Sequence, residues 1–329
     1  MPASFSDVGV VVTGGAGLIG SFLVDELVQC GARVRVVDDF SKGRESHIAH
    51  HDGRVEVIRG DLENADFACN ALAKADIVFH LASRAFGVGY SSTHHFNMLE
   101  HNERITNNVL GALYRSRPKH LLVVSSSCVY RDDGPSTIAE VPVFDGEPED
   151  VNRGYGWAKR FLEQKAEIFS SETGVPISIV RPFNIYGERY QWLGDKSQAI
   201  PMLVKKVMDG SDPVFVWGSG TQRRSYIHAV DCARMMLAVV RAQHRGPVNL
   251  GTPQTITMLG LVGLICQLAG LRPQVEIDMT KPEGRFVKSA DMSRFYQIAP
   301  AFALKVPLKC GLQRMLSWYK STFGAPVGR

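Results

Sequence analysis

The 329-residue sequence contains neither a long hydrophobic run nor a strong excess of charge of either sign. Its longest apolar stretch, residues 259–271, is interrupted by Gln267 and is shorter than the roughly 20 residues that a membrane-spanning helix needs. The 37 Lys and Arg against 33 Asp and Glu give a formal charge of +4, too small and too dispersed for a duplex-binding surface. We therefore expect no membrane span and no nucleic-acid partner, whereas an anionic small molecule would suit this charge.

Paired cysteine motifs and metal-ligand patterns are also missing. The six cysteines are scattered without Cys-x-x-Cys spacing, as is typical of reduced thiols in a cytosolic protein. His47, His50 and His51 lie in one polar stretch, but neither His-Glu-x-x-His nor a Cys/His zinc pattern occurs, so we predict no metal site. Residues 1–7 have no basic segment ahead of an apolar one, so we expect no secretory signal and a cytoplasmic location.

What the sequence does contain is an alternation of short apolar runs with amphipathic segments. Continuous, β-branched runs are typical of strands buried on both faces. They occur at residues 8–12, 34–37, 55–58, 77–80 and 121–125, and helical patterns lie between them at residues 20–29, 67–74 and 105–115. The alternation predicts an α/β fold with a doubly wound parallel sheet of the Rossmann type.

The second half of the chain is less regular. A predicted helix at residues 155–171 stops at Gly174 and leads into a predicted strand at 177–181, so the sheet continues to about residue 182. Beyond Asn184 the chain becomes rich in Gly, Pro and aromatic residues, as expected for a ligand-binding lobe. We predict a dinucleotide-binding domain over residues 1–182 and a smaller, mainly substrate-binding α/β lobe over 183–329. A predicted helix at 226–241 and strand at 248–250 would return the chain to the first domain around 226–250.

A glycine-rich segment, Val8-Gly-Val-Val-Val-Thr-Gly-Gly-Ala-Gly-Leu-Ile-Gly20, links the first predicted strand to the first predicted helix. Its glycines satisfy Gly14-x-x-Gly17-x-x-Gly20 and also Gly15-x-Gly17-x-x-Gly20. Such a loop turns tightly and places the free amides of a helix N-terminus against a pyrophosphate. The segment therefore predicts a dinucleotide site.

The next predicted strand ends at Asp38, 18 residues after Gly20. A carboxylate at this place can hydrogen-bond the ribose hydroxyls of a dinucleotide and repels a 2′-phosphate, which favours NAD over NADP. Lys42 and Arg44 follow closely and could soften that preference. Asp61, after the third predicted strand, could face the adenine or simply cap a helix.

Tyr155 and Lys159 are four residues apart and share one face of a predicted helix. A lysine ammonium in this place is expected to lower the pKa of the phenol and make it a usable base. The pair follows Ser125-Ser-Ser-Cys-Val-Tyr130, which begins where the fifth predicted strand ends. Open α/β sheets bind ligands at that edge, so we expect the two motifs to meet there.

Together these motifs resemble the extended short-chain dehydrogenase/reductases, in particular their nucleotide-sugar epimerase branch, over nearly the whole chain. Within the branch the sequence is most similar to GDP-mannose 3,5-epimerase and GDP-fucose synthase, because Cys128 stands in a Ser-Ser-Cys-x-Tyr motif. The segments that carry the resemblance are Thr13–Gly20, Asp38, Gly60–Leu62, His80–Ala82, Asn102, Ser125–Tyr130, Tyr155–Lys159, Arg181–Gly187, Gly220–Tyr226 and Lys281–Gly284.

The resemblance implies an NAD-dependent nucleotide-sugar epimerase, a homodimer that favours GDP-sugars. Tyr155 would take the C4 hydroxyl proton while a hydride passes to NAD, Lys159 would hold the nicotinamide ribose, and Ser126 would bind the same hydroxyl. Cys128 could remove or deliver a proton at C3 or C5, its pKa lowered toward neutrality by a nearby cation. The implied cofactor contacts are Gly14, Gly17, Leu18, Ile19, Gly20, Asp38, Asp61, Leu62, Leu81, Ala82, Asn102, Tyr155 and Lys159. The implied substrate contacts are Ser127, Asn184, Lys196, Gln198, Arg224, Arg285 and Lys288.

One position departs from these relatives, which have a His or Lys where this sequence has Gln198. A glutamine carries no proton at neutral pH, so double inversion at C3 and C5 is in doubt unless Lys196 substitutes. A single inversion, or C4 inversion by hydride return to the other face, fits equally well. The alternatives are an NAD(P)H-dependent reductase of 4-keto sugars, or an epimerase-reductase, and a non-catalytic sensor of dinucleotides or sugar nucleotides. Trp192 and Trp217 could stack on a base or fill the smaller lobe.

Overall fold

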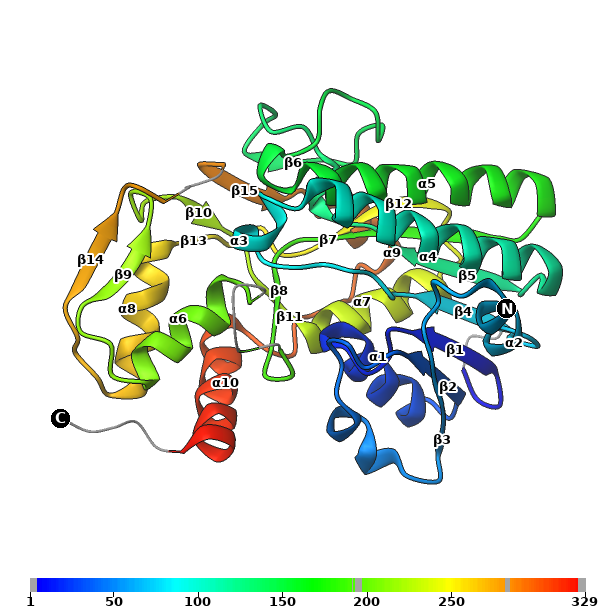
Figure 1. The fold of residues 1–329 in the computed structure, drawn as a ribbon, viewed down its shortest axis with the longest axis horizontal. Coiled ribbons are helices and arrows are strands. Elements are labelled where there is room, and N and C mark those ends of the chain that lie inside the picture. The colour runs from blue at the N-terminus through cyan, green and yellow to red at the C-terminus, as the bar shows by residue number, and fades with distance from the viewer. Residues whose placement is uncertain (1–4, 191, 193–196, 282–284, 325–329) are drawn as a thin grey trace.

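The computed structural model describes residues 5–190, 192, 197–281 and 285–324. Its largest sheet contains β1 (Gly9–Thr13), β2 (Arg33–Asp38), β3 (Val55–Arg59), β4 (Ile77–His80), β5 (His120–Val124), β7 (Ile177–Pro182) and β12 (Gly246–Leu250). The strands are parallel and lie in the order β12-β7-β5-β4-β1-β2-β3 (Figure 1). The predicted Rossmann sheet is confirmed, and β12 brings the chain back to its edge beside β7.

The described helices are α1 (Leu18–Gln29), α2 (Ala65–Ala71), α3 (Val88–Ser91), α4 (His95–Ser116), α5 (Arg153–Thr173), α6 (Ala199–Met208), α7 (Ala229–Arg241), α8 (Met258–Ala269), α9 (Ser293–Ile298) and α10 (Leu308–Phe323). Helices α4 and α5 lie along one face of the sheet, and α1 and α7 lie along the other (Figure 1). None of the described helices is long and apolar enough to cross a bilayer.

Alternation along the central strands explains this layering. Val10 and Val12 of β1 belong to the buried cluster shared with α1 and α7, whereas Val11 belongs to the cluster shared with α4 and α5. Successive side chains of a strand point to opposite faces of a sheet, so an unbroken run of valines supplies both cores at once.

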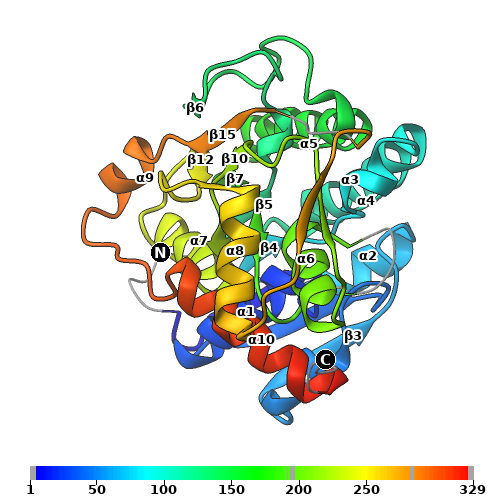
Figure 2. The same ribbon diagram turned by 90° about the vertical axis from the view of Figure 1, so that its left-hand side faces the viewer.

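A second group of elements packs at one end of the sheet. Its strands are β6 (Thr137–Ile138), β8 (Ile185–Tyr186), β9 (Val214–Trp217), β10 (Arg223–Arg224), β11 (Ile227–His228), β13 (Ile256–Thr257), β14 (Val275–Asp278) and β15 (Val287–Ala290). They form a four-stranded sheet, β13-β10-β15-β6, and two strand pairs, β11-β8 and β14-β9. Helices α6, α8 and α10 enclose a separate buried cluster here (Figure 2).

Two predicted helices differ from the structure by more than two residues at their starts. Helix α4 begins at His95, ten residues before its predicted start. The prediction missed these first turns because they are polar and bury only Met98 and Asn102. Helix α7 begins at Ala229 rather than at Tyr226, because Ile227 and His228 pair with β8 and the His228 ring then accepts the Val230 amide at 3.2 Å.

Candidate active site

A cavity of about 670 Å³ lies at the carboxyl ends of β1, β4 and β5. Gly14, Leu81 and Ser125, which follow these three strands, line one side of it. The opposite side includes Met202 of α6 and Trp217 of β9. The cavity thus lies where open α/β sheets bind ligands, between the sheet and the second group of elements.

The glycine loop forms the floor of the cavity next to α1. Gly14 has φ +67°, and a Cβ there would lie 2.9 Å from the Ala82 nitrogen, while a Cβ on Gly20 would lie 2.2 Å from the Gly14 oxygen. Gly17 is the N-cap of α1 and has no capping side chain, so the first amides of the helix face the cavity together with Leu18 and Ile19. This cradle, which a Cβ would fill, fits the pyrophosphate of a dinucleotide.

Asp38 ends β2 beside this loop and is buried. Its two carboxylate oxygens accept the amides of Ala16 at 2.9 Å and Phe40 at 2.8 Å. Burial raises the pKa of Asp38, and these two hydrogen bonds oppose the shift. Each oxygen retains a further lone pair, so the residue can still accept ribose hydroxyls, as the prediction requires.

The remaining predicted cofactor contacts divide into two groups. Asp61, Leu62, Leu81 and Ala82 line the cavity. Asn102 is absent from the described lining, and its side chain instead accepts the Ser83 hydroxyl at 2.8 Å and donates to the Met98 carbonyl at 2.6 Å. Asn102 therefore fixes the loop after β4 that carries the lining residues.

The predicted catalytic side chains meet where β5 ends and α5 begins. Ser126, Cys128, Tyr155 and Lys159 all line the cavity. The side chains of Ser83 and Ser126 lie close enough to the Tyr155 phenol to influence its ionisation. The Lys159 ammonium donates to the Val124 carbonyl at 2.9 Å and lies 5.5 Å from the centre of the Tyr155 ring. The Tyr155-x-x-x-Lys159 spacing thus brings both groups to the edge of the sheet.

Burial is the largest cause of the pKa shifts of Tyr155 and Lys159. It raises the pKa of Tyr155 above its usual value, against the opposing influence of the Ser83 and Ser126 side chains. It also lowers the pKa of Lys159 to about 8, although Glu163 and Cys128 oppose the shift. The expectation that Lys159 lowers the phenol pKa is corrected, because desolvation outweighs an ammonium that is bonded to a carbonyl.

A buried ion pair supports Lys159 from the next turn of α5. Glu163 accepts two hydrogen bonds from the Arg181 guanidinium, at 2.9 and 2.7 Å, and a third from the Ser125 hydroxyl. Tyr155, Lys159 and Glu163 recur every four residues, so one face of α5 holds the catalytic pair and its support.

Cys128 belongs to a buried polar cluster that the sequence did not predict. Its thiol lies close enough to the Glu149 carboxyl for each to influence the pKa of the other, and that carboxyl receives Lys288 Nζ at 3.2 Å and Asn152 Nδ2 at 2.7 Å. Burial raises the pKa of Cys128 to about 11, against the attraction of Lys288. The expected lowering toward neutrality is therefore wrong: the cation is present but neutralised by Glu149, and the group is a thiol at neutral pH.

The opposite wall holds several predicted substrate contacts. Ser127, Asn184, Gln198 and Arg224 line the cavity. Asn184 adopts φ +42° and donates to the Ser225 carbonyl at 2.9 Å, while Gln198 is the N-cap of α6. Arg224 lies on β10 directly beside Lys288 of β15, so both side chains project from the same face of the small sheet.

Other predictions have different outcomes. Arg285 is not among the described lining residues, and its guanidinium donates to the carbonyls of Arg131 and Pro135. Lys196 lies outside the described residues. Trp192 is buried and stacks on Trp318 with ring centres 5.2 Å apart, whereas Trp217 is partly exposed and lines the cavity.

Glu149, Ser83, Arg84 and Tyr190 line the cavity but were missed by sequence reasoning. Glu149 lies in the acidic segment Glu147-Pro-Glu-Asp150, which has the composition of a solvated loop. Its partner Lys288 is 139 positions away, so no local spacing announces the pair. The only local signal is its closeness to Tyr155.

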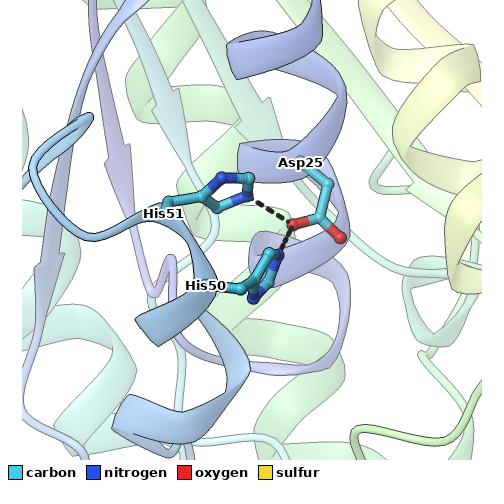
Figure 3. Close-up of side chains that lie close together, drawn as sticks. All are labelled: Asp25, His50 and His51. Atoms are coloured by element: carbon cyan, nitrogen blue, oxygen red, sulfur yellow. Dashed lines mark hydrogen bonds and ion pairs between the residues drawn. The ribbon is translucent and has the colours of Figure 1, made fainter.

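A second cluster lies outside the cavity, where His50 and His51 converge on Asp25 of α1 (Figure 3). Their Nε2 atoms lie 2.8 and 2.7 Å from one Asp25 oxygen, and Arg189 lies 2.9 Å from the other. Arg54 donates to His51 Nδ1 at 3.1 Å, which places the proton of that ring on Nε2. A metal would need that lone pair and would face two guanidinium groups, so we assign no metal here.

Comparison with known proteins finds a family model that matches most of the chain. Residues 10–251 match the NAD dependent epimerase/dehydratase family. UDP-glucuronic acid decarboxylase 1 of Arabidopsis thaliana is 30% identical over 95% of this chain and 70% of the relative.

Solved structures agree on the fold. The UDP-N-acetylglucosamine 4-epimerase of Methanobrevibacter ruminantium, in complex with UDP-N-acetylmuramic acid, has a TM-score of 0.86 at 24% identity and covers 96% of this chain and 99% of its own. The UDP-glucose 4-epimerase of Thermus thermophilus, in complex with NAD, has a TM-score of 0.82 at 22% identity and covers 95% and 99%. The glycine cradle and Asp38 provide the groups that such a cofactor needs.

Proposed function

The chain belongs to the NAD dependent epimerase/dehydratase family, and from that premise we propose that it is a nucleotide-sugar epimerase that oxidises the sugar transiently at C4. The observation that carries the proposal is the convergence of Ser126, Cys128, Tyr155 and Lys159 on one cavity with the glycine cradle. A non-catalytic sensor has no need of this intact group.

In this proposal, NAD held by the glycine cradle and Asp38 supplies reversible acceptance of a hydride from C4. Ser126 and Tyr155 bind the C4 hydroxyl, and Tyr155 moves its proton. Lys159 holds the nicotinamide ribose. Inversion takes place at the carbon beside the ketone: water takes the proton of that carbon on one face, and Cys128, a protonated thiol, delivers a proton to the other face and recovers one from water. C4 inversion instead would need only Ser126 and Tyr155, with the keto sugar turned over in the cavity.

The proposed substrate is a nucleoside diphosphate hexose, with Arg224 beside the diphosphate. The resemblance of the Ser-Ser-Cys-x-Tyr motif favours a GDP-sugar, whereas the named relatives act on UDP-sugars, so both belong in the assay. We also propose a homodimer and a cytoplasmic location. Light scattering on the eluting peak of a sizing column measures the assembly.

The test incubates the protein with GDP-mannose, UDP-glucose and related hexoses in deuterated water without added reductant, and follows the ring protons by NMR. We expect inversion with deuterium at C3 or C5, and a loss of about 10²-fold or more in Cys128→Ser. The control is Cys310→Ser, because Cys310 is exposed. Inversion at C4 without deuterium would assign the C4 reaction and leave Cys128 as part of the wall.

A second variant tests the catalytic group itself. Tyr155→Phe should reduce turnover by about 10³-fold, because the C4 hydroxyl loses its proton acceptor, while binding of the sugar nucleotide persists. Tyr296→Phe is the matched control on α9, where Tyr296 is 40% exposed. Full activity in Tyr155→Phe, steady consumption of NAD(P)H, or carbon dioxide release from UDP-glucuronate would each contradict an epimerase.

A further inference from the structure

The Glu149–Lys288 pair is unusual because it is a buried ion pair that also forms part of the cavity wall. Glu149 is 8% exposed and Lys288 is 5% exposed, and both line the cavity. Burying two charges is costly unless they are paired and hydrogen-bonded. Here Asn152 provides an additional hydrogen bond to the carboxylate at 2.7 Å.

The pair lies at the sugar end of the cavity. The backbone brings Cys128, Glu149 and Tyr155 together, because a Cβ on Gly156, next to Tyr155, would lie 2.7 Å from the Cys128 oxygen and 2.7 Å from the side chain of Pro148, next to Glu149. If Tyr155 and Ser126 bind the C4 hydroxyl, then Glu149 and Lys288 must face neighbouring positions of the same hexose. This step rests on the proposed function, because it uses the proposed place of the C4 hydroxyl.

Glu149 forms an ion pair with one of two adjacent cations. Arg224 and Lys288 are register partners on β10 and β15, so two positive groups stand side by side on one face of the small sheet. The ion pair of Glu149 is with Lys288, at 3.2 Å. Arg285 is also close enough to attract Glu149, but it is not among the described lining residues and donates to backbone carbonyls. Lys288, one of the predicted substrate contacts, is thus already paired with Glu149.

The neutral pair has hydrogen-bonding capacity for hydroxyl groups. An ionised carboxylate accepts about four hydrogen bonds, and Lys288 and Asn152 donate two, which leaves about two for the hydroxyl groups of a sugar. The Lys288 ammonium has three donors, of which Glu149 takes one. A second carboxylate brought against Glu149 would be repelled.

We propose that Glu149 and Lys288 form a neutral recognition pair that selects nucleotide sugars with an uncharged hexose and rejects those with a hexuronate. Glu149 is the residue that sets this specificity, because it cancels the charge of Lys288 and repels a substrate carboxylate. The chain would therefore differ in substrate charge from its relatives named for UDP-glucuronic acid.

The test uses two pairs of ligands that differ only at C6: UDP-glucose with UDP-glucuronate, and GDP-mannose with GDP-mannuronate. Dissociation constants are measured by calorimetry on the NAD-loaded protein carrying Tyr155→Phe, so that binding is read without turnover. We expect the neutral member of at least one pair to bind about 100-fold more tightly. Equal binding within both pairs, tighter binding of the uronate, or no binding of either neutral member would overturn the proposal.

Glu149→Gln then tests the residue. It removes the repelling charge and leaves Lys288 without its neutralising partner, so the preference for the neutral sugar should fall by at least tenfold. Asp150→Asn is the matched control, because Asp150 is the next acidic residue and is exposed. An equal loss of affinity for both sugars in Glu149→Gln would mean that Glu149 only supports the fold, and would contradict the proposal.

The double variant Glu149→Gln with Lys288→Met covers the case in which the single variant fails to fold, since neutral replacement of a buried pair is well tolerated. The preference of the double variant for the uncharged sugar should also fall at least tenfold. An unchanged preference would contradict the proposed role of Glu149 and Lys288 in recognition. Turnover distinguishes the two proposals: if no hexose is epimerised by the wild type while the charge preference stands, the proposed reaction fails and the recognition pair survives.

Discussion

On the cofactor side of the cavity, the lining groups lie after the strands of one parallel sheet or on the helices that follow them, whereas much of the opposite side is assembled from short strands and loops of several small sheets. Gly14 follows β1, Leu81 follows β4 and Ser126 follows β5. Across from them, Arg224 and Lys288 come from two-residue and four-residue strands more than sixty positions apart. In a parallel sheet, a residue that follows a strand in the sequence lies at the ligand-binding edge, so its place can be predicted. No comparable rule places the residues of the opposite wall.

The difference matters for function because the two sides perform different tasks. The cofactor side holds a ligand whose shape is constant, so backbone amides, one carboxylate and tight glycines are sufficient. The other side must distinguish one sugar nucleotide from another, and it does so with side chains such as Glu149 and Trp217. Changes on the first side should thus affect cofactor binding and folding, and changes on the second should affect substrate choice.

The largest contrast is expected from one substitution made in a helix on each side. Gly20→Ala places a Cβ 2.2 Å from the Gly14 oxygen and 2.8 Å from Gly15, so it should reduce stability by roughly 1–3 kcal/mol and displace the cofactor loop. Gly263→Ala in α8 meets no atom within 4 Å and should increase stability by about 1 kcal/mol. Thermal unfolding measures the stability of both variants, and titration with NAD measures their cofactor affinity. A Gly20→Ala variant with unchanged stability and unchanged NAD affinity would contradict the expected difference between the two sides.

Asp38→Ser should have the next largest effect and should be confined to the cofactor. Hydrogen bonds to a charged group contribute about 1.5–3 kcal/mol, so NAD affinity should fall on the order of 10–100-fold. The preference over NADP should narrow as well, because the charge that repels a 2′-phosphate is removed. Titration with both dinucleotides measures this, with exposed Asp66→Asn as control. An unchanged ratio of the two affinities would show that Asp38 plays no part in the choice.

The smallest effect is a change in pH dependence at Lys159. Its pKa is lowered to about 8 by burial, so the ammonium is present below pH 8 and is lost as the pH rises through that value. If the charged form holds the ribose, kcat/KM should fall about tenfold per pH unit above 8. Lys159→Arg keeps the charge at all these pH values and should lack this limb at a lower overall rate. A wild-type profile that stays flat to pH 10 would exclude a role for the ammonium.

The sequence was sufficient to predict every strand of the central sheet up to residue 182 within one residue at each end. Continuous β-branched runs are strong signals, since strands buried on both faces tolerate little else. It also predicted the glycine cradle, Asp38 and the Tyr155–Lys159 pair, because each depends on local spacing beside a strand or within one helix. The start of α4 was missed where the helix is polar.

Only the tertiary structure decided the chemistry that depends on burial and on distant partners. Sequence spacing placed Lys159 near Tyr155, but desolvation fixed the directions of their pKa shifts. Lys288 was predicted as a substrate contact, but its ion pair with Glu149, 139 positions away, is seen only in the structure, and burial beside that carboxylate leaves Cys128 as a thiol. Local pattern therefore determined where the cavity lies and what lines its cofactor side. The charge of its sugar side depends on which ionisable side chains are buried next to one another, and only the fold decides that.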